Sequence, residues 1–410
     1  MTKVSDSNKR RALIIGGSLG GLFAGNLLHQ IDWDVKIFER SAHDLDSRGG
    51  GIVLQPEVVE VFRRAGVDIQ TIDLGVRSQY RTVFRPDGSI ESKHFAPQTQ
   101  TSWSLIYTTL KAACGHRNYH RAKTVVRIEQ DLEAGTVMAH FEDGSCETGD
   151  LLVGADGGNS IVRQQFWPTM RPTYAGYLAW RGLIPEDDMP LAARETLHGD
   201  FGFANNKGSH ILGYLVPGED NDVRPGHRLY NWVWYRVADE RMLGEIMIDR
   251  NGHSRGYAIP EGLLADRWVE HLHREAENLL PLPFREVVEA TTQPFAQAIR
   301  DLASDLSDGS LSSVTLLRFP DPIPPRAPQR PQLTRLHWRT SCRLPRQTLL
   351  RLSHGGSGHK LHLASTFASR ALKLAITCSS TDRRLGKLGD AAQTFVSSCT
   401  PREPADLPVV

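Results

Sequence analysis

A glycine cluster between two short apolar segments constrains the fold of this chain more than any other feature. Residues 11–40 read RALIIGGSLGGLFAGNLLHQIDWDVKIFER, and residues 12–15 have the continuous apolar character of a buried parallel strand. Apolar residues then recur at helical spacing, and a second apolar segment, 35–38, ends at Glu39. This order predicts a compact β-α-β unit of the Rossmann type.

The glycines follow the spacing of a dinucleotide-binding turn. In that fingerprint, G-x-G-x-x-G follows a strand, and an acidic residue stands about 20 positions further on. Gly16, Ser18 and Gly21 take the three small positions here, and Glu39 takes the acidic one. The helix N-terminus would face a pyrophosphate, and the Glu39 carboxylate would accept hydrogen bonds from a ribose. A flexible turn before a packed helix would explain the glycines, but it explains less well why strand, turn, helix, second strand and acidic residue all occur in this order. The unit alone does not distinguish binding of FAD from binding of NAD.

A second motif follows an apolar strand further along the chain. Residues 150–163, DLLVGADGGNSIVR, carry D-G-x-x-S-x-x-R as Asp156, Gly157, Ser160 and Arg163. A carboxylate at a strand end can bind a ribityl or ribose hydroxyl, and Arg163 can reach a phosphate or pack the motif in place. Taken alone, the motif is better explained as an Asp-Gly turn with an N-capping serine.

Several further segments complete a family pattern. The segments are GGSLGGL (16–22), FER (38–40), GIVLQPE (51–57), SLIY (104–107), GADGGNSIVR (154–163) and PTYAGYLAWRG (172–182). Together they resemble the class A flavoprotein monooxygenases, the para-hydroxybenzoate hydroxylase-like family, and look most like its 2,6-dihydroxypyridine 3-monooxygenase branch. The resemblance covers roughly the first three quarters of the chain.

The resemblance implies an α/β fold in which a Rossmann-like FAD-binding domain is interleaved with an antiparallel-sheet substrate domain. Aromatic and polar residues alternate in YAGYLAWRGL and LYNWVWYRV, as in a sheet with one covered face. We expect the FAD-binding domain at 1–72 and 98–168, the substrate domain at 73–97 and 169–275, a return to the FAD-binding domain at 276–304, and an irregular segment at 305–410.

The family's chemistry would follow from the resemblance. NADH or NADPH would reduce the FAD, O2 would add to it as a C4a-hydroperoxide, and an aromatic or N-heteroaromatic ring would attack the distal oxygen. Because the cofactor carries this chemistry, few catalytic side chains are needed; the sequence identifies none, and it contains no metal-binding cluster. Two alternatives stay open: an inactive flavin-binding remnant, and a flavoprotein reductase or cyclase that uses no oxygen.

The resemblance also implies site residues. The ADP half of FAD would be held by Gly16, Ser18, Gly21, Glu39 and Arg40, the flavin side by Arg48 and Gln55, and the second motif by Asp156, Gly157 and Arg163. Many relatives carry an FAD-contacting arginine near residues 101–103, and this chain has none there. A flat aromatic substrate pocket would include Tyr174, Tyr214 and Trp232, although packing within the sheet is an equally good explanation for about half of the aromatic residues in this region.

Composition excludes several classes of partner. The formal net charge is +1 and no basic block occurs, which argues against nucleic acid as the main partner. The five cysteines are widely spaced, as is usual in a reducing cytosol, and no apolar segment is long enough to span a bilayer. We therefore expect a cytoplasmic enzyme that acts on a small aromatic molecule. The composition is compatible with a homodimer but does not require one.

The family's third motif, G-D-A-A followed by P-R-P-H-T-A-A-G and a long helix, is missing after residues 301–304. A stray G-D-A-A at residues 389–392 stands too near the end of the sequence for that helix to follow. Residues 313–345 can be back-translated and the reading frame moved one base earlier, so that each codon takes the last base of the preceding one. With suitable synonymous codons, this shifted frame encodes I-G-D-A-A-S-F-P-R-P-H-T-A-A. This match indicates a frameshift near residues 304–310, in the gene or in its sequencing; a divergent, disordered tail is the alternative.

Resequencing the coding DNA across codons 300–385 tests this hypothesis. We expect a missing or extra base whose correction restores the G-D-A-A and P-R-P-H-T-A-A segments in order. If the printed frame stands, either the gene itself carries the shift or the hypothesis is wrong, and poor FAD retention is expected.

Overall fold

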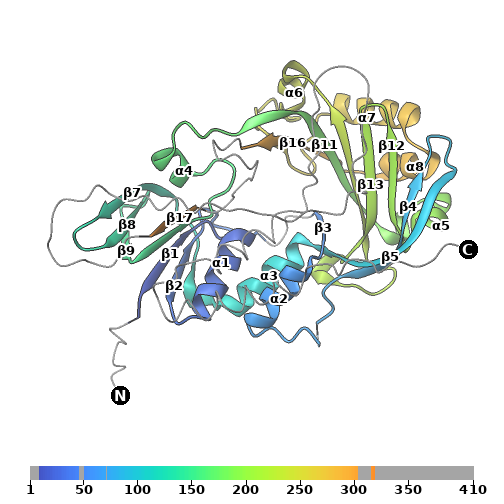
Figure 1. Cartoon of the computed structure of the whole chain (residues 1–410). Helices are drawn as coiled ribbons and strands as arrows, with labels where there is room; N and C mark the ends of the chain where they lie inside the picture. The colour runs from blue at the N-terminus through green and yellow to red at the C-terminus, as the bar shows by residue number, and fades with distance from the viewer. Residues whose placement is uncertain (1–8, 46–49, 71, 303–314, 319–410) are drawn as a thin grey trace, which may run out of the picture.

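The structure, a computed structural model, describes residues 9–45, 50–70, 72–302 and 315–318. It contains two large sheets, with a five-stranded sheet in the lower part of Figure 1 and a nine-stranded sheet at the upper right. We call them sheet A and sheet B. Strand β3 (Gly51–Val53) and the long strand β5 (Ile90–Ser102) are the last two strands of sheet B, and β3 lies near sheet A in Figure 1. The predicted α/β class with an interleaved antiparallel sheet is confirmed.

Sheet A contains the predicted β-α-β unit. Strand β1 (Arg11–Ile15) pairs in parallel with both β2 (Asp34–Phe38) and β10 (Leu151–Gly154), and helix α1 (Leu19–His29) connects the first two strands. The strand order is β17-β10-β1-β2-β6, with β6 at Tyr119–His120 and β17 at Thr315–Arg318. Because the three central strands run in parallel, their carboxyl ends meet at one edge of the sheet, where ligands bind in open α/β sheets.

Each face of sheet A is covered. Helices α1, α2 (Pro56–Arg64) and α3 (Trp103–Cys114) pack on one face, where Leu22, Phe62 and Leu110 are fully buried. A small antiparallel sheet packs on the other and buries Leu13, Phe38 and Val137; its strands are β7 (Val125–Asp131), β8 (Thr136–Phe141) and β9 (Cys146–Gly149). Helix α4 (Ile161–Phe166) lies beside β7, and a short 3-10 helix, η1 (His116–Asn118), precedes β6.

Sheet B is predominantly antiparallel. Its order is β15-β16-β11-β14-β13-β12-β4-β5-β3. The bounds not yet given are β4 (Val76–Phe84), β11 (Thr173–Pro185), β12 (Phe201–Asn206), β13 (Ser209–Val216), β14 (Leu229–Val237), β15 (Ala258–Ile259) and β16 (Phe295–Asp301). Helices α7 (Asp266–Leu279) and α8 (Leu282–Ala290) cover its outer side in Figure 1, together with α5 (Leu191–Leu197) and α6 (Glu240–Ile246).

The two faces of sheet B differ in what they bury. Trp180, Trp232 and Trp234 face the helices and form the main core with Phe284. On the opposite face Phe201, Tyr214 and Val233 cluster with Val53 of β3. We call this second surface the glycine-loop face, because Gly50 and Gly51 pack against it.

The structure corrects the predicted domain limits. Residues 276–304 were expected in the FAD-binding domain, but β16 pairs with β11 and α8 packs into the sheet B core. The chain therefore stays in the substrate domain, since the alternating apolar residues of β16 complete the sheet beside β11. Residues 315–318, expected to be irregular, form β17 antiparallel to β10. The rest of the expected irregular segment lies outside the described residues.

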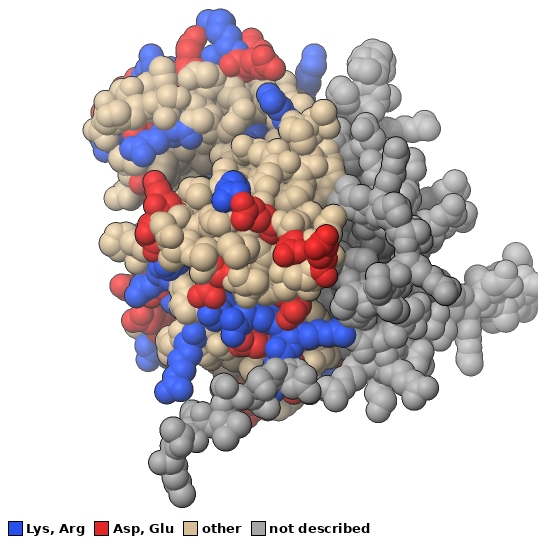
Figure 2. All heavy atoms as spheres, turned by 90° about the vertical axis from the view of Figure 1, so that its left-hand side faces the viewer, with Lys and Arg blue, Asp and Glu red and all other residues tan. Residues whose placement is uncertain are grey.

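Charge on the surface is mixed in sign. On the face of the molecule in Figure 2, Lys and Arg side chains lie beside Asp and Glu side chains on the coloured, described surface. Among the described residues, no helix is both long and apolar enough to cross a membrane, and no group of His, Cys, Asp and Glu is arranged to hold a metal ion.

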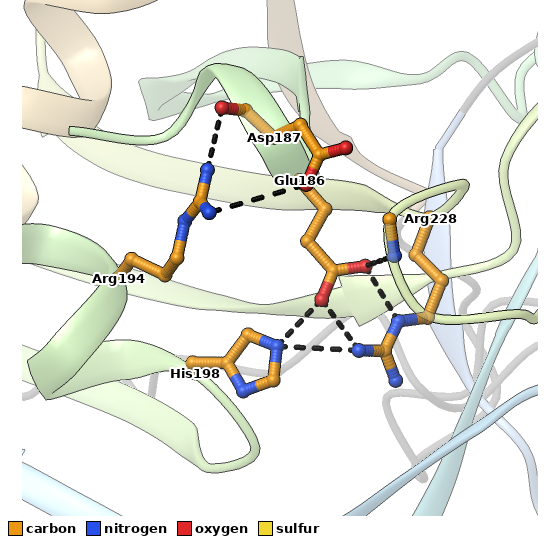
Figure 3. A network of polar contacts seen from close by, with 6 residues as sticks. Glu186, Asp187, Arg194, His198 and Arg228 are labelled. Carbon is orange, nitrogen blue, oxygen red and sulfur yellow. Dashed lines mark hydrogen bonds and ion pairs between the residues drawn. The ribbon is translucent and has the colours of Figure 1, made fainter. Parts of the chain in front are cut away.

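A buried ionic network fixes one end of sheet B (Figure 3). Glu186, in the 3-10 helix η2 (Glu186–Asp188), is 4% exposed and accepts hydrogen bonds from the Arg228 guanidinium at 2.5 and 2.7 Å. Its carboxylate also accepts the Gly226 amide at 2.9 Å and lies 2.5 Å from Nε2 of His198. Although burial opposes ionisation, these partners lower the Glu186 pKa to about 2.

Substituting Glu186→Gln tests this network. A pKa lowered from 4.5 to about 2 means that the ionised carboxylate stabilises the fold above pH 4.5, and that this contribution is lost as the pH falls toward 2. We expect Glu186→Gln to lower the free energy of unfolding by about 3 kcal/mol at pH 7, because it leaves Arg228 buried without a carboxylate. Urea unfolding at neutral and acidic pH measures this, with the exposed Glu142→Gln as the control. A loss that is the same at both pH values would contradict the role of the charge.

Candidate functional site

The turn after β1 lies against the end of β10 at the carboxyl edge of sheet A. Gly16 has φ +104°, and a Cβ atom there would stand 2.3 Å from the carbonyl oxygen of Ala155. At Gly21 a Cβ atom would stand 1.9 Å from the Gly16 carbonyl oxygen. Only glycine allows these approaches, so the first fingerprint and the residues preceding Asp156 form one continuous edge.

The N-terminus of helix α1 opens at this edge. Ser18 is the N-cap in an extended conformation, and its side chain makes no capping hydrogen bond within the described residues. The first turn contains no acidic residue. The backbone amides of that turn have no intrahelical partner, and the helix dipole favours negative charge beside them. This arrangement fits the phosphate-binding role predicted for Gly16, Ser18 and Gly21.

Glu39 fixes the turn from the neighbouring strand. The side chain is 7% exposed, and its carboxylate accepts the Gly17 amide at 2.8 Å and the Ser41 amide at 2.9 Å. Tyr119 donates to the Gly17 carbonyl at 2.9 Å, and burial raises the pKa of its hydroxyl. Arg40 follows with an exposed side chain. Glu39 therefore stands where the fingerprint requires a ribose-binding acid.

The second motif is built mainly around its own helix. Asp156 accepts Ser160 Oγ at 2.5 Å and the Ile161 amide at 2.6 Å, so its carboxylate caps α4. Arg163 is 8% exposed and donates to the carbonyls of Gly157 and Gly158 at 3.3 and 2.5 Å. Burial lowers the pKa of Arg163. Arg163 was expected either to reach a phosphate or to pack the motif in place, and in the structure it packs the motif.

Gly157 leaves room at the same edge. Its φ is +80°, and a Cβ atom placed there would have no described heavy atom within 4 Å. This open space lies directly after β10, beside the turn that contains Gly16. The second motif therefore leaves exposed backbone at Gly157.

Gly50 and Gly51 connect the part of the molecule around sheet A to the central strands of sheet B. Asn231 of β14 accepts the Gly51 amide through Oδ1 at 2.9 Å. A Cβ atom on Gly51 would stand 2.6 Å from the Tyr214 ring, and one on Gly50 would stand 2.8 Å from the Arg181 guanidinium. The glycines thus allow Gly50 and the start of β3 to pack directly against β11, β13 and β14.

Two residues predicted for the flavin side flank these glycines. Gln55 is the half-buried N-cap of α2 and donates to the Val53 carbonyl at 3.3 Å. Arg48 lies outside the described residues. The role of Gln55 toward a flavin stays a prediction.

The aromatic residues predicted for a pocket separate onto different surfaces. Tyr214 is 4% exposed on the glycine-loop face, where its ring packs 4.7 Å from that of Phe201. Trp232 is fully buried on the opposite face, and its indole donates to Thr291 Oγ1 at 2.8 Å. Tyr174 is half-buried and donates to the Ala238 carbonyl at 3.0 Å. Only Tyr214 lies beside Gly51, so Trp232 fits the alternative of packing within the sheet.

Sequence reasoning missed polar residues of the glycine-loop face. Arg181 and Asn231 meet Gly50 and Gly51, and His210 stacks on Tyr235 with 6.0 Å between ring centroids. Burial lowers the pKa of His210 and raises that of Tyr214. The alternation in LYNWVWYRV could have identified this face, because Asn231, Val233 and Tyr235 alternate with buried tryptophans and so point to the opposite side of the sheet.

The close approach at Gly21 generates a prediction. We expect Gly21→Ala to displace α1 from the β1 turn and to abolish retention of bound flavin, since its Cβ atom would overlap the Gly16 carbonyl. Gly244→Ala is the matched control, because a Cβ atom at this helical position meets no described atom within 4 Å. Flavin absorbance per protein after gel filtration measures the effect. Equal retention by both variants would contradict the role of the turn.

Comparison with known proteins identifies the family. The family model described as "FAD binding domain-like" matches residues 174–301. The chain is 32% identical over 296 residues to 2,6-dihydroxypyridine 3-monooxygenase of Paenarthrobacter nicotinovorans, covering 72% of each chain.

Further relatives agree. The chain is 26% identical to 6-hydroxynicotinate 3-monooxygenase of Pseudomonas fluorescens, over 53% of this chain and 58% of that protein. The solved 2,6-dihydroxypyridine-3-hydroxylase of Arthrobacter nicotinovorans superposes with a TM-score of 0.67 at 30% identity, covering 74% of this chain and 75% of that one. These matches confirm the resemblance found in the sequence motifs: the chain belongs to the family of FAD-dependent aromatic-ring monooxygenases.

Proposed function

We propose that this enzyme hydroxylates a small aromatic or N-heteroaromatic ring, using FAD, O2 and either NADH or NADPH. When bound, FAD supplies the oxygen-activating chemistry of the family, and the nicotinamide supplies the electrons. Two observations support the proposal: the turn at Gly16 and Gly21 lies at the carboxyl edge of sheet A, and Gly50 and Gly51 lie against Arg181, Tyr214 and Asn231 of sheet B.

The residues at the carboxyl edge fit a dinucleotide. Gly16, Ser18 and Gly21 would bind the pyrophosphate through the α1 amides, and Glu39 would accept a ribose hydroxyl through its remaining lone pairs. Arg40 would add positive charge nearby. Asp156, Gly157 and Arg163 would form the adjoining wall, with Arg163 holding the motif in shape.

We place the substrate ring against the glycine-loop face. Phe201, Tyr214 and Val233 form an apolar cluster there, and Arg181 and Asn231 lie on the same face. A ring placed on this surface would be oriented by the aromatic residues and kept out of water, which is what the reaction requires from the protein. Tyr214 is the pocket residue that we retain; Tyr174 and Trp232 would act through packing.

An inactive flavin-binding remnant is the less well supported alternative. The described residues already form both covered sheets with buried cores, and the relatives are named as monooxygenases. A cytoplasmic location, a homodimer and the hydroperoxide route stay predictions.

An assay of the purified protein tests the proposal. We expect a yellow protein whose oxidation of NADH or NADPH is stimulated by hydroxypyridines, with O2 consumed and a hydroxylated product detected by mass spectrometry. The frame-corrected gene product serves as the comparison. Bound FAD with nicotinamide oxidation but no O2 uptake would favour a reductase, and the absence of FAD binding from both proteins would contradict the proposal.

A further inference from the structure

Trp103 lies at the start of α3, directly beside Gly50. Its backbone amide donates to the Gly50 carbonyl at 3.0 Å, and the preceding residue, Ser102, pairs with Gly51 of β3. The indole packs against the core on the helical face of sheet A, but the side chain is only half-buried. Trp103 therefore stands where the part of the molecule around sheet A meets sheet B.

A series of side-chain contacts connects Trp103 to the turn after β1. The rings of Trp103 and Tyr107 are stacked, with 5.0 Å between their centroids and 15° between their planes. The Tyr107 hydroxyl lies 3.2 Å from that of Tyr119, which donates to the Gly17 carbonyl at 2.9 Å. In this series Trp103 lies between Gly50, where we place the flavin ring, and the turn at which we place the pyrophosphate.

The neighbours of Trp103 hold its ring in position. Tyr107 is 1% exposed, so the surface on which the indole stacks is itself fixed in the core. The Lys111 ammonium lies 5.5 Å from the ring centroid of Tyr107 and 5.0 Å from that of Tyr119, and it forms an ion pair with Asp44. A ring held in this way loses little conformational entropy when it contacts a ligand.

The indole N–H of Trp103 is available to a ligand. An indole nitrogen donates a hydrogen bond and cannot accept one. Trp232, Trp234 and Trp268 each donate to an oxygen atom of the protein. Within the described ranges Trp103 Nε1 has no acceptor, and it is not among the buried unpaired atoms, so this N–H is accessible.

We infer that Trp103 is a cofactor-binding residue, and that its indole N–H donates to an oxygen of the FMN half of FAD. This inference rests on the proposed function and assigns a further residue to the same site. The ribityl hydroxyls and the phosphate joined to them offer only oxygen acceptors to such a donor, and a phosphate oxygen would make the stronger bond. The ADP half is assigned to the turn at Gly16 and to Glu39, so loss of the indole N–H should affect the FMN half alone.

Rebinding of ligands to the FAD-free protein tests the inference, with FAD and ADP as the two probes and calorimetry as the measurement. Trp103→Phe keeps an aromatic ring on Tyr107 but removes the N–H. We expect it to weaken FAD binding about 10-fold and to leave ADP binding unchanged. Trp33→Phe is the matched control, because Trp33 is also half-buried against the same core but precedes β2, at the opposite edge of sheet A. It should change neither affinity.

The indole N–H resonances of the unsubstituted protein provide a second measurement. The Trp103 resonance is the one that is missing from the spectrum of Trp103→Phe, or of Trp103→Tyr if the phenylalanine variant does not fold. We expect this resonance to shift when FAD is added and to stay in place when ADP is added.

Three results would overturn the inference alone. They are unchanged FAD affinity in Trp103→Phe, a Trp103 resonance that does not respond to FAD, and an equal loss of affinity for FAD and ADP. The last result would show that Trp103 acts through Tyr107, Tyr119 and the turn, without touching the cofactor. Failure of the unsubstituted protein to bind FAD, both as printed and frame-corrected, would instead contradict the proposed function on which the inference rests.

Discussion

Backbone contact at the carboxyl edge of sheet A determines where everything else in this molecule can lie. The turn at Gly16 lies so near the Ala155 carbonyl that a Cβ atom would come within 2.3 Å of it, and Gly21 brings α1 equally close to the turn. Glu39 ties the turn to the end of β2 by accepting the Gly17 amide. Three strands and one helix N-terminus therefore converge on a small surface that suits a dinucleotide.

The second structural link joins that surface to the substrate domain. Asn231 accepts the Gly51 amide, and the absence of side chains at Gly50 and Gly51 lets the loop lie against Tyr214 and Arg181. The contact also separates the two faces of sheet B, because the tryptophan-rich face is filled by helices and only the other face meets the loop.

Local patterns predicted the parts of the structure that depend on neighbouring residues. The β-α-β unit and the Asp156 turn each follow from residues close together in the sequence. The position of β16 did not follow, because its partner β11 is more than a hundred residues earlier and pairing at that distance leaves no local signal.

Sequence distance also explains why some site residues were not predicted. Alternation along β14 showed that Asn231 and Trp232 point to opposite faces, but not which face meets the glycine loop. That choice depends on Gly51, which is 180 residues from Asn231. Arg181 lay within a segment that already indicated the family, yet its position beside Gly50 becomes visible only when the sheet is assembled.

We propose that the turn at Gly16 and the glycine-loop face together hold the flavin and its substrate. A crystal structure of the FAD-loaded protein tests this most directly. We expect the adenosine ribose at Glu39, the pyrophosphate at the N-terminus of α1, and the flavin ring beside Gly50 and Gly51. A flavin ring bound away from these glycines, or a ribose that does not contact Glu39, would contradict it.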